Sequence, residues 1–166
     1  PSFVSVDAQL QARTTSHKID GLPDPKHKVS DGVSNIILTG IGGTGVLTVS
    51  AITAMAAHYE GKESTILDMT GLAQKGGAVW SHIKIYEKNV KTFSHKIAPA
   101  SANLFLACDA VVGTKPEIQE VLSDKKTYSI INSDTIPVAD FVTNRDLDFK
   151  DDEVLKVIDK TTKDID

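Results

Sequence analysis

Apolar and polar positions alternate along the chain in blocks that predict short strands separated by helices. Short apolar runs bounded by glycine, proline or polar residues predict buried strands, and they lie at residues 35–39, 64–68, 104–108 and 128–131. Residues 46–59, which follow the first of these runs, contain no charged residue and are long enough for a helix. Strands that alternate with helices predict an α/β fold with a Rossmann-like layered sheet, mostly parallel, and helices on both faces.

Three further elements complete the predicted sheet and the helices that cover it. Residues 78–86 alternate between apolar and polar side chains, which predicts a third strand. We expect residues 90–95 to pair back on it as the one antiparallel hairpin, across a turn at 87–89. Residues 116–122 predict a short helix with Pro116 near its start, where proline is favoured.

The predicted helix at 46–59 is apolar on nearly all sides. Val46, Val49 and Ile52 lie on one side of a helical projection, and Leu47, Ala51 and Met55 lie on the other. A helix of this kind is usually covered on both sides. We therefore expect the sheet to cover one face and another chain or domain to cover the other, and we expect a homo-oligomer.

The distribution of proline, glycine and charge divides the chain into three parts. Residues 1–33 carry prolines and mixed charges without periodicity and are expected to form a linker or arm. Residues 34–150 are expected to form the domain, and residues 151–166 a charged tail. Because the chain begins at Pro1 and stops within a charged segment, we expect a piece of a longer protein whose domain is truncated.

Composition narrows the class of protein. At 166 residues, with 40% hydrophobic and 24% charged residues, the chain suits one soluble domain. A net charge of -4 without a Lys/Arg cluster argues against nucleic acid as a partner. The single cysteine, Cys108, leaves no disulfide and no four-cysteine metal site within the chain, which suits a reducing cytoplasm. Glycines interrupt the uncharged run at 32–59, and the remaining helix is too short to span a membrane.

A glycine-rich turn between the first strand and the helix is the main candidate site. Gly40, Gly42 and Gly45 match the spacing G-x-G-x-x-G, and Gly43 and Thr44 complete the turn. In such a turn the first glycine permits the tight bend, the second lets a phosphate approach the backbone, and the third lets the helix pack on the strand. The alternative is that these glycines serve only strand-to-helix packing.

Asp68 ends the second predicted strand. A dinucleotide-binding fold places its ribose-binding acid at that position. The alternative is that Asp68 only caps or orients the loop that follows.

A second glycine motif follows one strand later. Gln74, Lys75, Gly76 and Gly77 lie in a loop without acidic residues. The glycines could form a nest of backbone N–H groups, with Lys75 adding positive charge for an anion. The alternative is a bulged strand entry in which the glycines only allow close backbone contact.

The remaining reactive side chains do not form a catalytic set. His58, His82 and His95 have no metal-ligand spacing and are interpreted as surface or packing residues, and Cys108 as a small buried apolar residue. We therefore predict no catalytic residue and no metal ligand in this chain. It has the character of a domain that completes a site formed with others.

Together these motifs resemble a known family. The turn at 39–46, the uncharged helix ending at His58 and the stretch 68–82 closely resemble the gamma-type domain of 2-oxoacid:ferredoxin oxidoreductases. The resemblance is closest to the fused indolepyruvate ferredoxin oxidoreductases and covers residues 34–150.

The resemblance implies a reaction and a set of partners. It implies CoA-dependent oxidative decarboxylation of a 2-oxoacid to an acyl-CoA and carbon dioxide, with ferredoxin reduced. Thiamine diphosphate with magnesium and [4Fe-4S] clusters would be held by thiamine-binding and ferredoxin-like domains of the full enzyme, and not by this chain. The gamma domain would assist assembly and contact coenzyme A through the loops at 40–45 and 74–77. The isolated chain is expected to be inactive.

Three alternatives stay open. An adenylating enzyme of the ubiquitin-activating type shares the glycine turn, but it needs arginines near that turn and the chain has only Arg13 and Arg145. An NAD(P)- or flavin-binding Rossmann domain is favoured by Asp68 but not by the second glycine motif. A non-catalytic interaction module would use both loops for packing alone.

Overall fold

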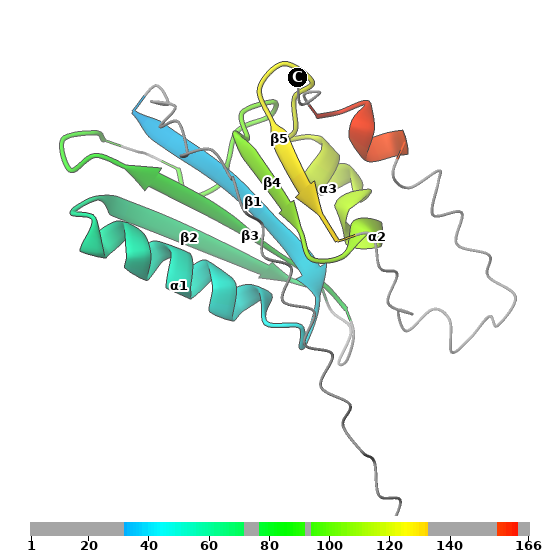
Figure 1. The fold of residues 1–166 in the computed structure, drawn as a ribbon, viewed down its shortest axis with the longest axis horizontal. Helices are drawn as coiled ribbons and strands as arrows, with labels where there is room; N and C mark the ends of the chain where they lie inside the picture. Colours follow the sequence, from blue (N-terminus) through cyan, green and yellow to red (C-terminus); the bar gives the residue numbers. More distant parts are fainter. Residues whose placement is uncertain (1–31, 72–76, 92–93, 133–155, 163–166) are drawn as a thin grey trace, which may run out of the picture.

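A mixed sheet of five strands forms the centre of the structure, a computed structural model that describes residues 32–71, 77–91, 94–132 and 156–162 (Figure 1). Every predicted strand core is confirmed except the one expected at 90–95. In chain order the strands are β1 (Val33–Ile41), β2 (Glu63–Thr70), β3 (Ala78–Tyr86), β4 (Leu104–Ala107) and β5 (Tyr128–Ile131).

The strand order corrects one part of the predicted topology. The order across the sheet is β2-β3-β1-β4-β5, and β3 runs antiparallel to both of its neighbours. The pairs β1–β4 and β4–β5 are parallel. Four strands therefore run in one direction, as expected for a mostly parallel sheet, but β3, which lies between β1 and β2, runs in the opposite direction.

The predicted hairpin between 78–86 and 90–95 is wrong. Of residues 90–95, those that the structure describes are not in a strand. The antiparallel hairpin is formed instead by β2 and β3, which pair along their whole length from Glu63↔Tyr86 to Thr70↔Val79. Both faces of β3 are buried at its centre, at Ser81, His82 and Ile83. This burial follows from the cover on both faces of the sheet, whereas the place of β3 between β1 and β2 is set by its pairing with both of them.

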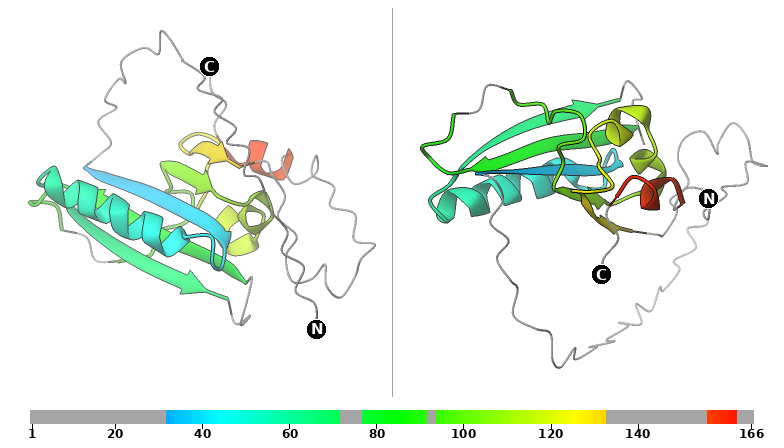
Figure 2. Two further views of the ribbon diagram at one scale, coloured as in Figure 1. Left: turned by 60° about the horizontal axis from the view of Figure 1, so that its bottom comes forward. Right: turned by 90° about the horizontal axis from the view of Figure 1, so that it is seen from above.

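One long helix covers one face of the sheet. α1 (Val46–Tyr59) lies along β2, β3 and β1 on the same side (Figure 2, left), with the bounds that the uncharged run predicts. Beneath it Leu38, Val46, Val79 and Ile83 form a buried cluster.

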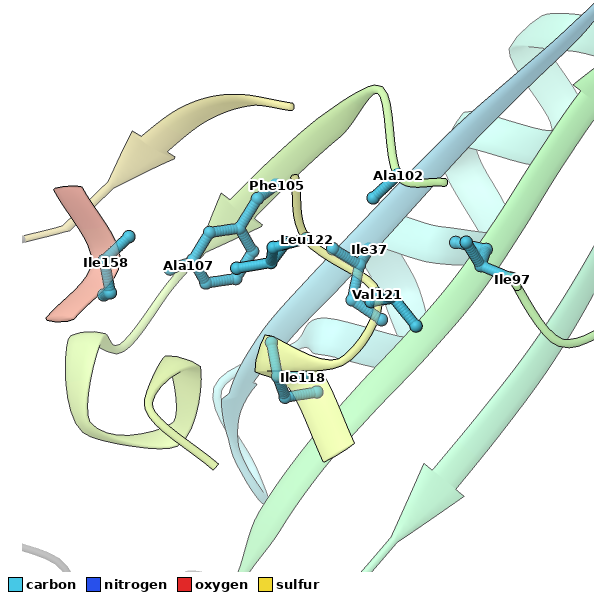
Figure 3. Close-up of a cluster of buried hydrophobic side chains, with 9 residues drawn as sticks. All are labelled: Ile37, Ile97, Ala102, Phe105, Ala107, Ile118, Val121, Leu122 and Ile158. Carbon is cyan, nitrogen blue, oxygen red and sulfur yellow. The ribbon is translucent and has the colours of Figure 1, made fainter. Parts of the chain in front are cut away.

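The opposite face carries the larger core. Two helices of one turn each, α2 (Ala110–Gly113) and α3 (Pro116–Gln119), lie on this side of β1 and β4 (Figure 2, right). Helices on both faces are thus confirmed, although α2 was not predicted. Figure 3 shows the buried cluster, to which Ile158 contributes from a helical turn at 156–159 within the segment expected to be a charged tail. Its members are Ile37, Ile97, Ala102, Phe105, Ala107, Ile118, Val121, Leu122 and Ile158.

The predicted arm falls outside the described residues except for its last two positions, Gly32 and Val33. In the part of the chain that the structure describes, no helix is long and apolar enough to cross a membrane.

Candidate functional site

The glycine turn joins the end of β1 to the start of α1. The backbone N–H of Thr44 donates to the carbonyl of Ile41 over 3.1 Å, and its hydroxyl donates to the same oxygen over 2.6 Å. Gly43 and Gly45 have φ angles of 94° and 89°, in the left-handed region that favours glycine. A Cβ at either position would meet no atom within 4 Å. The turn is therefore fixed at its base by Thr44 and open to solvent at its tip.

Gly40 is required by close packing rather than by the bend. A Cβ at this position would lie 2.6 Å from Cγ2 of Val46 and 3.2 Å from Cβ of Cys108. Helix packing was the role expected for Gly45, and the tight turn was expected for Gly40. The structure reverses these two roles, because Gly40 is buried under α1 while Gly45 carries the positive φ.

Gly42 brings the two glycine motifs together. Its backbone N–H donates to the carbonyl of Gly77 over 2.7 Å, and a Cβ on Gly42 would lie 3.3 Å from that oxygen. We expected a phosphate to lie close to the backbone of Gly42. In the structure the carbonyl group of Gly77 lies there instead. Residues 74–76, which include Lys75, lie outside the described residues, so ligand binding by this loop stays a prediction.

The first turn of α1 offers unpaired donors beside the glycine turn. Gly45 is the N-cap and has no side chain to cap the helix, and no acidic residue lies in the first turn. The first α-helical bond is donated by Val49 to Gly45, so the N–H groups of Val46, Leu47 and Thr48 have no acceptor within the helix. Free N–H groups at the positive end of a helix dipole suit an anion such as a phosphate.

Asp68 has a structural role. It lies on β2, and its Oδ1 accepts a hydrogen bond from the hydroxyl of Ser81 on β3 (2.5 Å). The hydroxyl of Ser50 on α1 lies 3.4 Å from the same oxygen, but its nearer acceptor is the carbonyl of Leu47 at 2.9 Å. Because β3 lies between β1 and β2, Asp68 is not on the strand beside the glycine turn, where a dinucleotide fold places its ribose-binding acid. The strand order gives no support to the NAD(P) or flavin alternative.

Ser50 and Ser81 are residues that sequence reasoning missed. Both side chains are fully buried and face Asp68, and Ser81 donates to it. Their signal in the sequence is a hydroxyl at a position that helical or strand periodicity places on the core face. The Ser81 bond joins β2 to β3, and Ser50 brings α1 beside the same carboxylate.

The three histidines that the structure describes lie in different settings, and none is hydrogen-bonded to Cys108. His58 and His95 are exposed, whereas His82 is fully buried and its Nδ1 accepts a bond from the N–H of Ile97 (3.4 Å). Burial, and after it the positive charge of Lys96, lower the pKa of His82. Burial raises the pKa of the half-buried Cys108 thiol, so it is a poor nucleophile at neutral pH. Among the described residues, no three His, Cys, Asp or Glu side chains are placed to hold a metal ion.

The face of α1 that points away from the sheet is apolar. Ile52, Met55 and Tyr59 are 63%, 55% and 84% exposed. With Thr48 they occupy positions i, i+4, i+7 and i+11, which form one stripe along a helix. The prediction that the sheet covers one side of this helix is confirmed, and the expected cover for the other side stays a prediction.

Comparison with known proteins points to one family. Residues 35–161 match the family described as pyruvate ferredoxin/flavodoxin oxidoreductase. A 51-residue stretch is 43% identical to indolepyruvate oxidoreductase subunit IorB of Archaeoglobus fulgidus, and it covers 31% of this chain and 25% of that protein.

Two solved structures are similar to this chain at low sequence identity. Pyruvate oxidoreductase subunit PORC of Thermotoga maritima is 22% identical with a TM-score of 0.47, over 67% of this chain and 55% of that one. The gamma subunit of a keto/oxoacid ferredoxin oxidoreductase from Geobacter sulfurreducens is 21% identical with a TM-score of 0.45, over 63% and 56%. The chain thus spans about half the length of these subunits and a quarter of the length of the curated relative.

Proposed function

The chain belongs to the pyruvate ferredoxin/flavodoxin oxidoreductase family, and from that membership we propose that it is the gamma-type domain of an indolepyruvate-type 2-oxoacid:ferredoxin oxidoreductase. The family match over residues 35–161 carries the proposal, because it includes both glycine motifs and all five strands. The identity with the indolepyruvate subunit supports the finer assignment.

The full enzyme would oxidise an aryl pyruvate. A 2-oxoacid and coenzyme A give an acyl-CoA and carbon dioxide, and the two electrons released reduce ferredoxin. Thiamine diphosphate would supply the carbanion chemistry and [4Fe-4S] clusters the path for electrons.

This chain does not suit those redox and thiamine groups. A [4Fe-4S] cluster needs four cysteine thiolates, and the chain has only Cys108. The described residues also offer no cluster of acidic or imidazole side chains for magnesium. Both groups would be held by neighbouring domains, and the isolated chain would not turn over substrate.

The glycine turn offers backbone donors for phosphate, and we assign it to coenzyme A because coenzyme A is the phosphate-bearing substrate of the proposed reaction. The N–H groups of Val46, Leu47 and Thr48 have no acceptor within the helix, and the turn residues Gly43 and Gly45 before them carry no side chain. This chain's part would be to bind and orient the acyl acceptor, with Lys75 adding positive charge.

The apolar outer face of α1 would serve assembly. The stripe formed by Ile52, Met55 and Tyr59 has no charged neighbour within the helix, and exposed apolar surface of this kind marks a protein–protein contact. We assign it to the contact with the thiamine-binding or ferredoxin-like part of the enzyme.

A thermal-shift series tests the ligand. The chain is heated with coenzyme A, NAD, NADP, ATP or FAD, and a ligand at about 100 times its Kd stabilises the fold by roughly 2.7 kcal/mol. The proposal expects a rise in Tm with coenzyme A alone. A rise with NAD or ATP alone would contradict it and favour one of the nucleotide-binding alternatives.

A second candidate function is an interaction module without a ligand. The bond from Gly42 to Gly77 favours it, because that bond uses the two glycine motifs to pack against each other. Absence of a shift with every ligand, together with retained binding to the rest of the enzyme, would support this candidate over the coenzyme A site.

A further inference from the structure

A hollow lies at the other end of the sheet from the glycine turn. It has a volume of about 390 Å³ and lies beside the start of β1, at Val33 and Asn35, and near the end of β3, at Lys84. Asn35 and Ile41 are six residues apart on β1, which at about 3.3 Å per residue separates this hollow from the glycine turn by roughly 20 Å. The two sites are therefore independent.

The outer wall of the hollow is a strap at residues 94–101, which is held at several points. The side chain of Ile97 is buried among Ile37 and Val121 (Figure 3), and its N–H donates to His82. Asn35 Nδ2 donates to the carbonyl of Ser101 over 3.0 Å, which fixes the end of the strap to β1. A wall attached in this way forms the hollow before any ligand arrives.

Two ammonium groups dominate the charge of the hollow. Lys84 Nζ donates to the carbonyl of Ser94 over 2.9 Å, so the lysine is positioned by the strap while its charge faces no carboxylate among the described residues. Lys96 lies 3.9 Å from Glu120, and both of these side chains are about half exposed. Two lysines and one glutamate leave a net charge of +1, which suits a monoanion better than a phosphate ester.

The remaining lining is largely apolar. Val33, Ala98 and Pro99 supply carbon surface around the charged groups. A volume of about 390 Å³ falls within the ~300–1,000 Å³ typical of small-molecule sites. A ligand that is complementary to both the positive charge and the apolar lining has one negative charge and an apolar body.

We propose that this hollow, here called the strap pocket, binds a small carboxylate with an apolar body, whose charge lies between Lys84 and Lys96. The strap pocket goes beyond the proposed function and does not depend on it, since it shares no residue with the glycine turn or with the outer face of α1.

The test is a titration of the ¹⁵N-labelled chain followed by NMR. The probe is 3-phenylpropionate, with 3-phenylpropionamide as the uncharged match and acetate as the anion without an apolar body. With 3-phenylpropionate we expect saturable chemical-shift changes at the amides of Ile97, Ala98 and Ser101. The amide and acetate should each bind at least about fivefold more weakly, because the loss of one contact of ~1 kcal/mol has that effect.

Two variants and a control assign the shifts to the pocket. Lys84→Met and Lys96→Met should each weaken binding about fivefold, whereas Lys88→Met, in the exposed turn after β3, should leave it unchanged. If Lys84→Met fails to fold, the result with Lys96→Met decides. This variant should fold, because the ion pair of Lys96 with Glu120 is long and exposed and adds little to stability. Absence of saturable shifts, equal binding of the amide, or binding that survives Lys96→Met would overturn the proposal.

Discussion

At the scale of single residues, the glycines of the turn after β1 are needed for different physical reasons. Gly40 leaves room for Val46, Gly42 leaves room for the backbone of Gly77, and Gly43 and Gly45 adopt a positive φ. Their spacing could be read from the sequence, but these roles could not, because each depends on an atom that only the folded chain brings near. Replacement by alanine therefore acts differently at each position.

Gly40→Ala should lower the free energy of unfolding by about 1–3 kcal/mol, because the added methyl overlaps the side chain of Val46. Urea denaturation followed by circular dichroism measures the change. In the double variant with Val46→Ala the overlap is gone, so the two losses should be clearly less than additive. Simple additivity would show that Gly40 does not act through Val46.

His82 should make stability depend on pH. Its pKa is lowered from the ordinary 6.5 in the folded chain, so below about pH 6.5 the unfolded state binds the proton more readily. The free energy of unfolding should therefore fall as the pH falls, by up to about 1.4 kcal/mol per unit, until the folded pKa is reached.

Urea titrations between about pH 7 and pH 5 measure this slope. His82→Phe should reduce it, and His58→Phe, at an exposed position, should keep it. If the free energy of unfolding depends equally on pH in the unchanged chain and in the His82→Phe variant, His82 is not the cause of the pH dependence.

At the scale of elements, local pattern predicted which segments are strands and helices but not how the strands are ordered. β3 has the bounds that alternation predicts, and α1 those of the uncharged run. The position of β3 between β1 and β2 depends on pairing between distant segments, and a turn after β3 looked sufficient for a hairpin with 90–95. In the structure both edges of β3 are occupied, by β1 and by β2, so no edge is left for a strand at 90–95.

The outer stripe of α1 should govern self-association of the isolated chain, because the neighbouring part of the enzyme that would cover the stripe is then absent. Ile52→Lys combined with Met55→Lys should abolish concentration-dependent association in static light scattering. Because both side chains are exposed, the free energy of unfolding should change by less than about 1 kcal/mol.

Ile130→Lys is the matched control for this variant, since Ile130 is 60% exposed but lies on β5, away from α1. Association that persists in the α1 variant, or that Ile130→Lys removes equally, would contradict a role for the stripe.

At the scale of the whole molecule, two sites lie at opposite ends of the strands. The glycine turn and the free N–H groups of α1 lie at the end of β1, and the strap pocket lies at its start. The family could be predicted from the two glycine motifs, because their combination is specific. The contact between them could not, since Gly42 and Gly77 are far apart in the chain and meet only once β3 pairs with β1.

Calorimetric titration of coenzyme A into the chain and two variants at Thr48 tests the central claim most directly. Thr48 is exposed in the first turn of α1, so Thr48→Asp places a negative charge beside the proposed phosphate without harming the helix, and Thr48→Asn is its neutral match. We predict that coenzyme A binds the chain and Thr48→Asn within about twofold of each other, and Thr48→Asp about tenfold more weakly. No binding to the chain, or equal binding to the two variants, would contradict a coenzyme A site at the glycine turn.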